Sequence, residues 1–403
     1  MFTLNGKFAE AKVFTDNVDD ANIGLIIAML NEYIAKDTIV RIMPDTHYGK
    51  RVPIGTTIKL PDDKSQWKVS PSVVSGDIGC GMMSYKIKRP STLDLSKLDA
   101  VINKYIPAGP NLNIRPKDRT FTQNLLKNAR MQHKLIDITG LDYSLGSLGG
   151  GNHFIELAVA DNDDLWLTVH TGSRHFGQSV HQFYQKQANT HYADWYMNKV
   201  LSYMKEHGQA IMTKDVMTNI DKSYVLSNSD YAYLTDDRLD DYLHDLSLAQ
   251  RFAIHNRKTI LDTIVDLMHF TVIDQFDSIH NYIDLEYGII RKGATSAQKD
   301  QRLIIPLNMR DGSLICKGKG NPDWNYSAPH GAGRQYSRSV MKQRTNLPEF
   351  KEQMANVYTS SVTEHTLDEA PDAYKPMNDI IDNIGDTVEI IDHIKPIYNF
   401  KAH

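Results

Sequence analysis

The chain has 403 residues, 41% hydrophobic and 23% charged, with a formal net charge of −4 at pH 7. This balance is typical of a folded globular protein, and it excludes both a disordered chain and a generally basic protein that coats nucleic acid. No uncharged apolar run approaches the roughly 20 residues that cross a bilayer, no signal-peptide pattern opens the chain, and two cysteines are too few for a disulfide framework, so we expect a cytoplasmic protein.

The first part of the chain predicts strands joined by loops that carry polar residues. Thr38 to Leu60 has the pattern of a strand, the polar loop PDTHYGKR and a second strand. The glycine-rich loop SGDIGCG comes next, before the alternating strand MMSYKIK, so we expect Asp77 and Cys80 on a tight turn. Apolar spacing predicts helices over Leu93 to Ile106 and Phe121 to Ile138.

The later part of the chain predicts more strands around a helical segment. LGSLGGGNHFIELAVA and LWLTVHTGSR each contain a strand next to a glycine loop, and long amphipathic helices follow from Gln178 to Phe270, with a polar break around Ser227 to Asp237. Further strands, a helix starting near Gly331 and a final strand at the carboxyl end complete the chain. This mixed order predicts an α+β fold: one irregular domain over residues 1–403, with mixed sheets and a helical insertion over residues 178–270.

The residues that suggest metal chemistry lie at loop edges. Asp77 and Cys80 stand three residues apart among glycines, which allow a carboxylate and a thiolate to face one point. By itself this pair equally describes a turn aspartate next to a buried cysteine. His153, His170 and His280 also lie at strand–loop junctions, and with the pair they form a credible ligand set for zinc, manganese or iron.

His330 stands in a different context, because it precedes Gly331, Ala332, Gly333 and Arg334 and then the expected helix. A helix amino terminus with an arginine attracts phosphate, and a histidine held there acts as general acid or as a nucleophile that forms a phosphoramidate. An ordinary histidine before a glycine loop is the other interpretation. The chain contains no phosphate-binding loop of the Walker type and no dinucleotide fingerprint.

Taken together, these motifs resemble the RtcB family of RNA ligases. The segments MPDTHYGK, SGDIGCGM, GGGNHFIE, HTGSR, RKGAT, GKGNPDWNYSAPHGAGR and EAPDAYK occur in the order that this family shows, and the resemblance covers nearly the whole chain. It implies a distinctive α+β fold and a reaction that uses GTP and manganese. In that reaction a 2′,3′-cyclic phosphate or 3′-phosphate RNA end is joined to a 5′-hydroxyl end.

The resemblance also implies residue roles. Cys80 bridges two Mn²⁺ ions, Asp77 and His153 complete one site, His170 and His280 complete the other, and His330 becomes guanylylated. Many members have a proline-glycine-serine-methionine turn where this chain reads IPLNMRDGS. The nucleotide is surrounded by several segments, and the last lysine faces the guanine. The nucleotide-binding residues are Asn152, His153, Phe154, Ile155, Glu156, His280, Asn281, Pro306, Leu307, Asn308, Met309, Ser313, His330, Gly331, Ala332, Gly333 and Lys401.

The sequence leaves two other functions open. A two-metal phosphodiesterase or phosphatase acting on RNA ends would use a similar ligand set. A non-catalytic RNA-binding module is less favoured, because it has no need of an Asp/Cys/His cluster. In the first loop, Asp45 and His47 either help to open a cyclic phosphate or, for Asp45, stabilise a turn.

Overall fold

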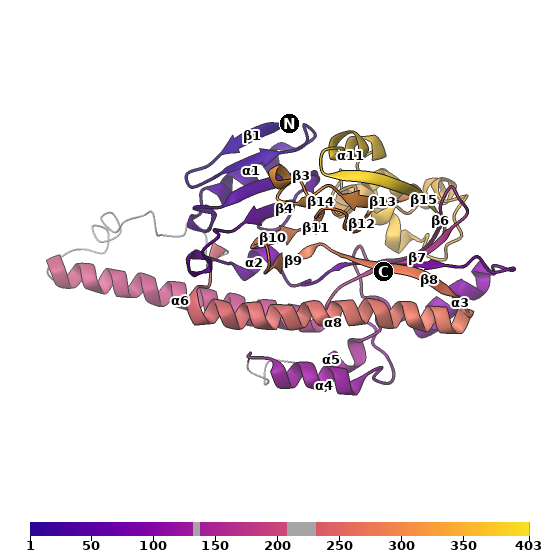
Figure 1. Cartoon of the computed structure of the whole chain (residues 1–403), viewed down its shortest axis with the longest axis horizontal. Coiled ribbons are helices and arrows are strands. Elements are labelled where there is room, and N and C mark those ends of the chain that lie inside the picture. Colours follow the sequence, from indigo (N-terminus) through magenta and orange to yellow (C-terminus); the bar gives the residue numbers. More distant parts are fainter. Residues whose placement is uncertain (132–137, 208–230, 403) are drawn as a thin grey trace.

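In the part of the chain that the structure describes, the strands form three sheets with helices packed around them (Figure 1). The structure is a computed structural model, and it describes residues 1–131, 138–207 and 231–402. A six-stranded sheet has the order β1-β2-β3-β4-β10-β9 and is antiparallel except between β2 and β3. Its strands are β1 Phe2–Asn5, β2 Glu10–Val13, β3 Ile39–His47, β4 Ile54–Lys59, β9 Asn281–Asp284 and β10 Ile289–Lys292.

The second large sheet is antiparallel and has the order β12-β13-β15-β6-β7-β5-β8, and β11 and β14 form a separate pair. Only His280 separates β8 from β9, so the chain passes there directly from one large sheet to the other. The strands are β5 Gly81–Ile87, β6 Phe154–Val159, β7 Leu165–Thr171, β8 Val272–Ile279, β11 Ala294–Ser296, β12 Arg302–Asn308, β13 Gly312–Gly318, β14 Ser327–Pro329 and β15 Val388–Lys401.

Two long helices, α6 and α8, lie side by side under the sheets, and α8 packs on β5 and β7 (Figure 1). None of the described helices combines the length and apolar character needed to span a membrane. The helices are α1 Asp20–Leu30, α2 Pro71–Val74, α3 Leu95–Tyr105, α4 Arg119–Asn128, α5 Ile138–Ser144, α6 Arg174–His207, α8 Asp236–Met268, α9 Arg338–Arg344, α10 Leu347–Gln353 and α11 Met377–Ile384.

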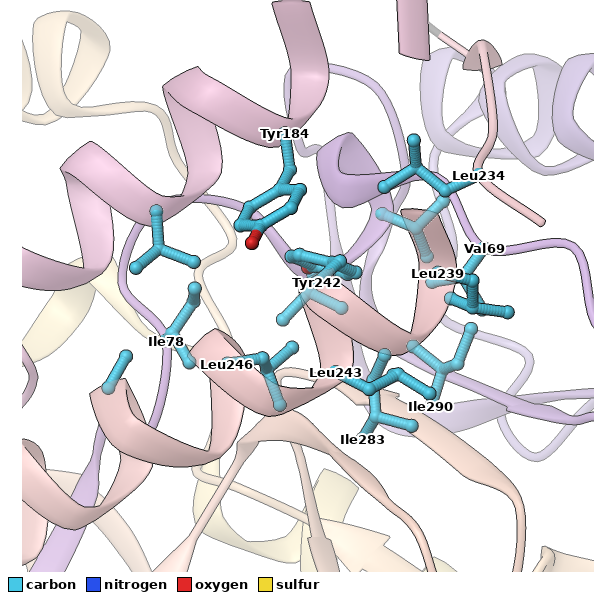
Figure 2. Close-up of a cluster of buried hydrophobic side chains, with 14 of the residues drawn as sticks. Val69, Ile78, Tyr184, Leu234, Leu239, Tyr242, Leu243, Leu246, Ile283 and Ile290 are labelled. Atoms are coloured by element: carbon cyan, nitrogen blue, oxygen red, sulfur yellow. The ribbon is translucent and has the colours of Figure 1, made fainter. Parts of the chain in front are cut away.

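A hydrophobic cluster fixes the SGDIGCG loop to these helices (Figure 2). Tyr184 of α6 and Tyr242 of α8 pack with ring centroids 5.3 Å apart, and Ile283 and Ile290 approach from β9 and β10. Ile78, at the centre of the loop, is fully buried in the same cluster. Burying one such side chain contributes about 1.5–3 kcal/mol, so the core itself holds the loop that carries Asp77 and Cys80.

The predicted α+β fold class is confirmed, and the helix expected from Leu93 to Ile106 is α3. Helices α6 and α8 occupy most of the segment predicted as a helical insertion. The insertion itself and the single domain over residues 1–403 stay predictions. Residues 227–230 of the expected break at 227–237 lie outside the described residues, and α8 begins at Asp236.

Three expectations about individual elements were wrong. The helix predicted from Phe121 to Ile138 ends at Asn128, because the next residue has an extended backbone, and 132–137 are not described. Strand β3 continues to His47, further into the PDTHYGKR segment than expected. The helix predicted near Gly331 begins only at Arg338, because Gly333 has a φ of +74°, which a helix does not allow.

Candidate metal and nucleotide site

Five predicted metal ligands meet where strands of the seven-stranded sheet begin or end. Asp77 and Cys80 precede β5, and His153 precedes β6. His170 lies on β7, and His280 follows β8. The strand register explains why these residues meet. His170 pairs with Met82 of β5, two residues after Cys80, and with Phe154 of β6, the residue after His153. The backbone N–H of His280 donates to the carbonyl of Cys80 at 2.9 Å, which ties the loop to the β8–β9 junction.

The ligand atoms form two groups that share one sulfur. Cys80, His170 and His280 are one group, Asp77, Cys80 and His153 are the other, and the atoms within each group lie within 4.8 Å of one another. The Cys80 Sγ lies 3.1 Å from His170 Nε2 and 3.5 Å from His153 Nε2. The Nε2 atoms of His170 and His280 are 3.1 Å apart. Such convergence of soft and nitrogen donors is what a pair of cations requires.

Proton positions support a cation in this cluster. His153 Nδ1 lies 2.8 Å from the carbonyl oxygen of Leu148, which only accepts, so Nδ1 carries the proton. The Nε2 lone pair then faces a carboxylate oxygen of Asp77 at 3.2 Å. Two acceptors at that distance repel each other unless a proton or a metal ion lies between them. The donor set therefore fits a metal centre on its geometry.

The buried histidines are in the form that binds metal. Burial lowers the pKa of His170 and of His280 well below the ordinary value, and neighbouring histidines lower each further. Both imidazoles are therefore neutral at pH 7, with a lone pair available.

The two acidic ligands differ in their proton affinity. Burial acts to raise the pKa of Asp77, but a proton on His153 Nε2 would supply a hydrogen bond and a charge that outweigh burial and hold the pKa below its usual range; a cation at the same place would favour the ionised carboxylate in the same way. Burial, and then the charge of Asp77, raise the pKa of Cys80 well above that of an ordinary thiol. A cation must therefore displace the thiol proton, so ion binding at this site releases a proton.

Arg257 of α8 holds both halves of the cluster in place. Its side chain is fully buried and forms a bidentate pair with Asp277, at 2.6 and 2.8 Å. The same guanidinium donates to the carbonyl oxygens of Gly79 and Thr171, at 2.7 and 2.9 Å. These carbonyls lie next in the chain to Cys80 and His170, so one arginine fixes the backbone beside two ligands.

Replacing Arg257 with leucine is expected to lower the free energy of unfolding by about 3 kcal/mol or more, because Asp277 loses its buried partner. Metal affinity should fall with it. Urea denaturation measures the first effect and metal titration the second. Lys258→Ala is the matched control, because its pair with Asp262 is exposed and contributes no more than about 0.5 kcal/mol. An Arg257→Leu protein as stable as this control would contradict the assignment.

His330 is oriented by Asp45, which is completely buried. The Asp45 Oδ2 lies 2.6 Å from His330 Nδ1 and accepts the His330 backbone N–H at 3.1 Å. The carboxylate therefore keeps the proton on Nδ1 and leaves the Nε2 lone pair free to act as a nucleophile. The His330 ring centroid is 4.9 Å from that of His280, which places the free imidazole beside the predicted metal ligands.

The turn after His330 is not a helix start, so the predicted phosphate site at a helix amino terminus was wrong. A Cβ on Gly333 would lie 2.1 Å from the backbone oxygen of Asp45, so only glycine lets the turn close against β3. Arg334, expected to attract phosphate there, is paired with Glu369 at 3.3 Å. The turn brings His330 close to Asp45 instead of presenting helix N–H groups.

A pocket of about 830 Å³ opens beside His330, with His170 on its wall. Small-molecule sites occupy about 300–1,000 Å³, so a nucleotide fits with room to spare. Most of the predicted nucleotide-binding residues line this pocket. They are Asn152, Phe154, Glu156, Pro306, Leu307, Asn308, Met309, His330, Gly331, Ala332, Gly333 and Lys401.

The other predicted contacts lie behind the pocket wall. Ile155 is buried in the hydrophobic core on the opposite face of β6, because side chains alternate along a strand. The Asn281 side chain accepts the Gly293 N–H at 2.9 Å, and the Ser313 hydroxyl reaches Glu156 at 3.5 Å. His153 and His280 belong to the metal-ligand cluster. Ile155 would therefore contact a nucleotide only through its backbone.

Buried charged side chains fix the position of Lys401, which lines the pocket. The Lys401 Nζ lies 2.7 Å from Glu369 Oε2, and both side chains are almost completely buried. Tyr374, Arg334 and Arg338 also donate to the Glu369 carboxylate. Burial raises the pKa of Glu369, but the charges of Lys401 and the two arginines more than offset this and lower it to about 2. The carboxylate thus stays ionised and fixes the lysine.

Sequence reasoning missed two of these supporting residues. Glu369 lies in the EAPDAYK segment, which was noted as a motif without a role for the glutamate. Arg257 had one usable signal: it stands between the buried apolar residues Ala253, Ile260 and Leu261 on one face of a helix. A charged residue on such a face needs a partner.

Fold and site together define an α+β protein with a candidate two-cation centre next to an oriented histidine and a nucleotide-sized pocket. The family model described as tRNA-splicing ligase RtcB matches residues 27–402. This chain belongs to the RtcB family. It is 28% identical to the RNA-splicing ligase RtcB1 of an Escherichia coli strain, over 99% of each protein. It is 24% identical to the tRNA-splicing ligase RtcB of Pyrobaculum aerophilum, over 85% of this chain and 82% of the relative.

Proposed function

We propose that this protein is a GTP- and manganese-dependent RNA ligase of RNA repair or tRNA splicing. It joins a 2′,3′-cyclic phosphate or 3′-phosphate RNA end to a 5′-hydroxyl end. Membership of a family described as tRNA-splicing ligases supports the activity. The observation that carries the mechanism is the free Nε2 of His330, which stands between the thiolate–imidazole cluster and a pocket that accommodates a nucleotide. Two free cysteines suit the reducing cytoplasm.

Two metal ions fit the shared-sulfur cluster. Asp77, Cys80 and His153 would hold one, and Cys80, His170 and His280 the other. Bound manganese would supply positive charge that offsets the negative charge of the phosphates. The protein's own part is to hold Cys80 and the three histidines apart from bulk water and to keep the three imidazole Nε2 atoms directed at one region.

A 2′,3′-cyclic end is first opened by water to the 3′-phosphate, and the reaction then proceeds by three displacements, in which His330 acts first as nucleophile and then as leaving group. The Nε2 attacks the α-phosphorus of GTP, a phosphorus–nitrogen bond forms and pyrophosphate leaves. An oxygen of the RNA 3′-phosphate then attacks the same phosphorus and releases His330, which leaves the RNA end linked to GMP through a pyrophosphate. The 5′-hydroxyl attacks the RNA phosphorus, and GMP leaves as the new phosphodiester forms. Asp45 keeps the imidazole in the required tautomer throughout.

The guanine would lie between Glu156 and Lys401 at the far end of the pocket. Burial raises the pKa of Glu156 to about 7, although Asn399 and the charge of Lys401 moderate the effect. The ionised carboxylate offers two acceptor oxygens to the N–H groups of guanine, whereas the protonated form presents an O–H donor in place of one of them. Glu156 therefore makes guanine recognition dependent on pH near neutrality.

Affinity for guanosine, measured without metal, is expected to fall as the pH drops from 8 to 6, because protonation turns one Glu156 oxygen from an acceptor into a donor. At one pH unit below the pKa about one tenth of the carboxyl groups remain ionised, so the weakening should approach tenfold at pH 6. Titration calorimetry in EDTA measures it and excludes the pH dependence of metal binding. Glu156→Gln should bind with the same affinity across this range. A wild-type affinity that stays constant from pH 6 to 8 would argue against the assignment.

Labelling with GTP tests the proposal. Protein incubated with Mn²⁺ and α-labelled GTP should retain covalent label, and His330→Ala should retain none although its metal content is unchanged. A two-metal phosphodiesterase, which the same cluster would also suit, forms no such adduct but hydrolyses a 2′,3′-cyclic phosphate without GTP. If the wild-type protein hydrolysed the cyclic phosphate and retained no label, it would be a phosphodiesterase and not a ligase.

A further inference from the structure

The turn from His330 to Gly333 divides the pocket into two sides. Gly331 lies against Pro306 of β12, where a Cβ would meet the Pro306 carbonyl oxygen at 3.2 Å. Gly333 lies against Asp45 of β3. Apart from the turn itself, the predicted nucleotide contacts that line the pocket lie on or next to β12, β6 and β15, all strands of the seven-stranded sheet. The β3 side has its own lining and no role so far; its residues are Asp19, Ala21, His47, Tyr48 and Ile54.

An exposed aromatic ring lies on the β3 side. Tyr48 is the first residue after β3, it lines the pocket, and 59% of its surface is exposed. Ala21 and Ile54, which also line this side, are apolar. The Tyr48 ring offers a flat surface to another ring, and the polar Asp19 in the same lining already accepts the backbone N–H of Asn22 at 2.7 Å. Single-stranded nucleic-acid ends are commonly held by stacking their bases on such aromatic side chains.

His47, next to Tyr48 in the chain, lies beside the nucleophile. Its ring is nearly parallel to that of His330, with centroids 6.3 Å apart. His47 Nδ1 donates to the backbone oxygen of Asp45 at 2.9 Å, which leaves the Nε2 lone pair free. Burial lowers the pKa of His47 to about 4, so this ring is neutral at pH 7 and accepts a hydrogen bond. It suits a ribose hydroxyl group.

We propose that the β3 side of the pocket binds the 3′-terminal nucleoside of the phosphate-bearing RNA end, with its base stacked on Tyr48 and its ribose beside His47. This inference rests on the proposed function and adds the site of its RNA substrate. The terminal phosphate must reach the phosphorus carried by His330. A base on Tyr48 and a ribose at His47 place that phosphate next in line, towards His330 and the metal ligands.

The test measures GMP transfer from pre-guanylylated protein to a 3′-phosphate oligonucleotide, without any 5′-hydroxyl acceptor. Tyr48→Ala is expected to raise the half-saturating oligonucleotide concentration about tenfold, equivalent to about 1.4 kcal/mol, as for the loss of one base stack. Tyr48→Phe should stay within about twofold, because the ring remains. The control is Tyr105→Ala, an exposed tyrosine on α3 that does not line this pocket.

An oligonucleotide that lacks its terminal base makes the test specific for stacking. Removing the terminal base should weaken oligonucleotide binding to the wild-type protein about tenfold. It should not weaken binding to Tyr48→Ala any further, since both changes remove the same contact. Equal values for Tyr48→Ala and wild type, or a terminal-base effect that persists in the variant, would overturn the subsite. A higher GTP requirement for adduct formation would also overturn it, because Tyr48 would then contact guanine.

A direct binding measurement tests this subsite independently of the proposed reaction. Fluorescence anisotropy of the labelled 3′-phosphate oligonucleotide, measured without GTP, should show the same tenfold difference between wild type and Tyr48→Ala. Failure of the wild-type protein to form an adduct would defeat the ligase proposal, whereas the binding comparison would still decide the role of Tyr48.

Discussion

Replacing Cys80 with alanine is expected to abolish both metal binding and adduct formation. Its sulfur belongs to both donor groups, so each would retain only two of its three ligands. Loss of a partner outside the ligand shell typically costs about 10- to 100-fold in metal affinity, and loss of a shared ligand should cost more. Metal content by mass spectrometry and label from α-labelled GTP measure the two effects.

Cys316→Ala is the matched control, because Cys316 is also buried and also free. It lies on β13 in a hydrophobic cluster, and burial raises its pKa to about 12, so it remains a thiol. Its replacement should leave two ions bound and label near the wild-type level. A Cys80→Ala protein that still held two ions would rule out the shared-sulfur centre.

Asp45→Asn is expected to slow adduct formation by at least about a hundredfold, on the scale of other histidines that lose their orienting carboxylate. The amide has nearly the shape of the carboxylate, but its NH₂ group donates. An amide N–H directed at His330 Nδ1 would move the imidazole proton to Nε2 and block the nucleophile. Single-turnover labelling at saturating GTP measures the rate.

Metal content distinguishes this effect from general damage to the site. Asp45 is not among the predicted ligands, so Asp45→Asn should bind two ions with unchanged affinity. A lower rate at full metal occupancy and wild-type stability is the expected pattern. Unchanged labelling would show that His330 does not depend on Asp45 for its tautomer.

The donor cluster illustrates what local sequence patterns predict well. Asp77, Cys80, His153 and His170 each lie at the junction of a glycine-rich loop and an apolar strand. Such loops gather at the ends of strands in a sheet, and the structure brings the four together from three strand ends. Which strands are neighbours was not readable from those patterns, because β5 pairs with β7 although α3, α4, α5 and β6 lie between them in the chain.

Features that depend on distant partners were missed or wrongly predicted. QYSRSVMKQR has helical spacing, but the turn before it follows the surface of β3, where Gly333 contacts Asp45. The role of Asp45 itself depends on a residue 285 positions further along the chain. Arg257 and Glu369 stabilise the site through similar long-range pairs. These contacts join residues far apart in the chain, so local sequence patterns do not reveal them.

Identifying the residue that carries GMP is the most direct test of this account. Wild-type protein would be incubated with Mn²⁺ and GTP, digested under neutral conditions that preserve a phosphorus–nitrogen bond, and its peptides sequenced by tandem mass spectrometry. We expect GMP on His330 alone, removed by mild acid. GMP attached to a lysine or to another histidine would contradict the proposal that Asp45 and the metal centre prepare His330 as the nucleophile.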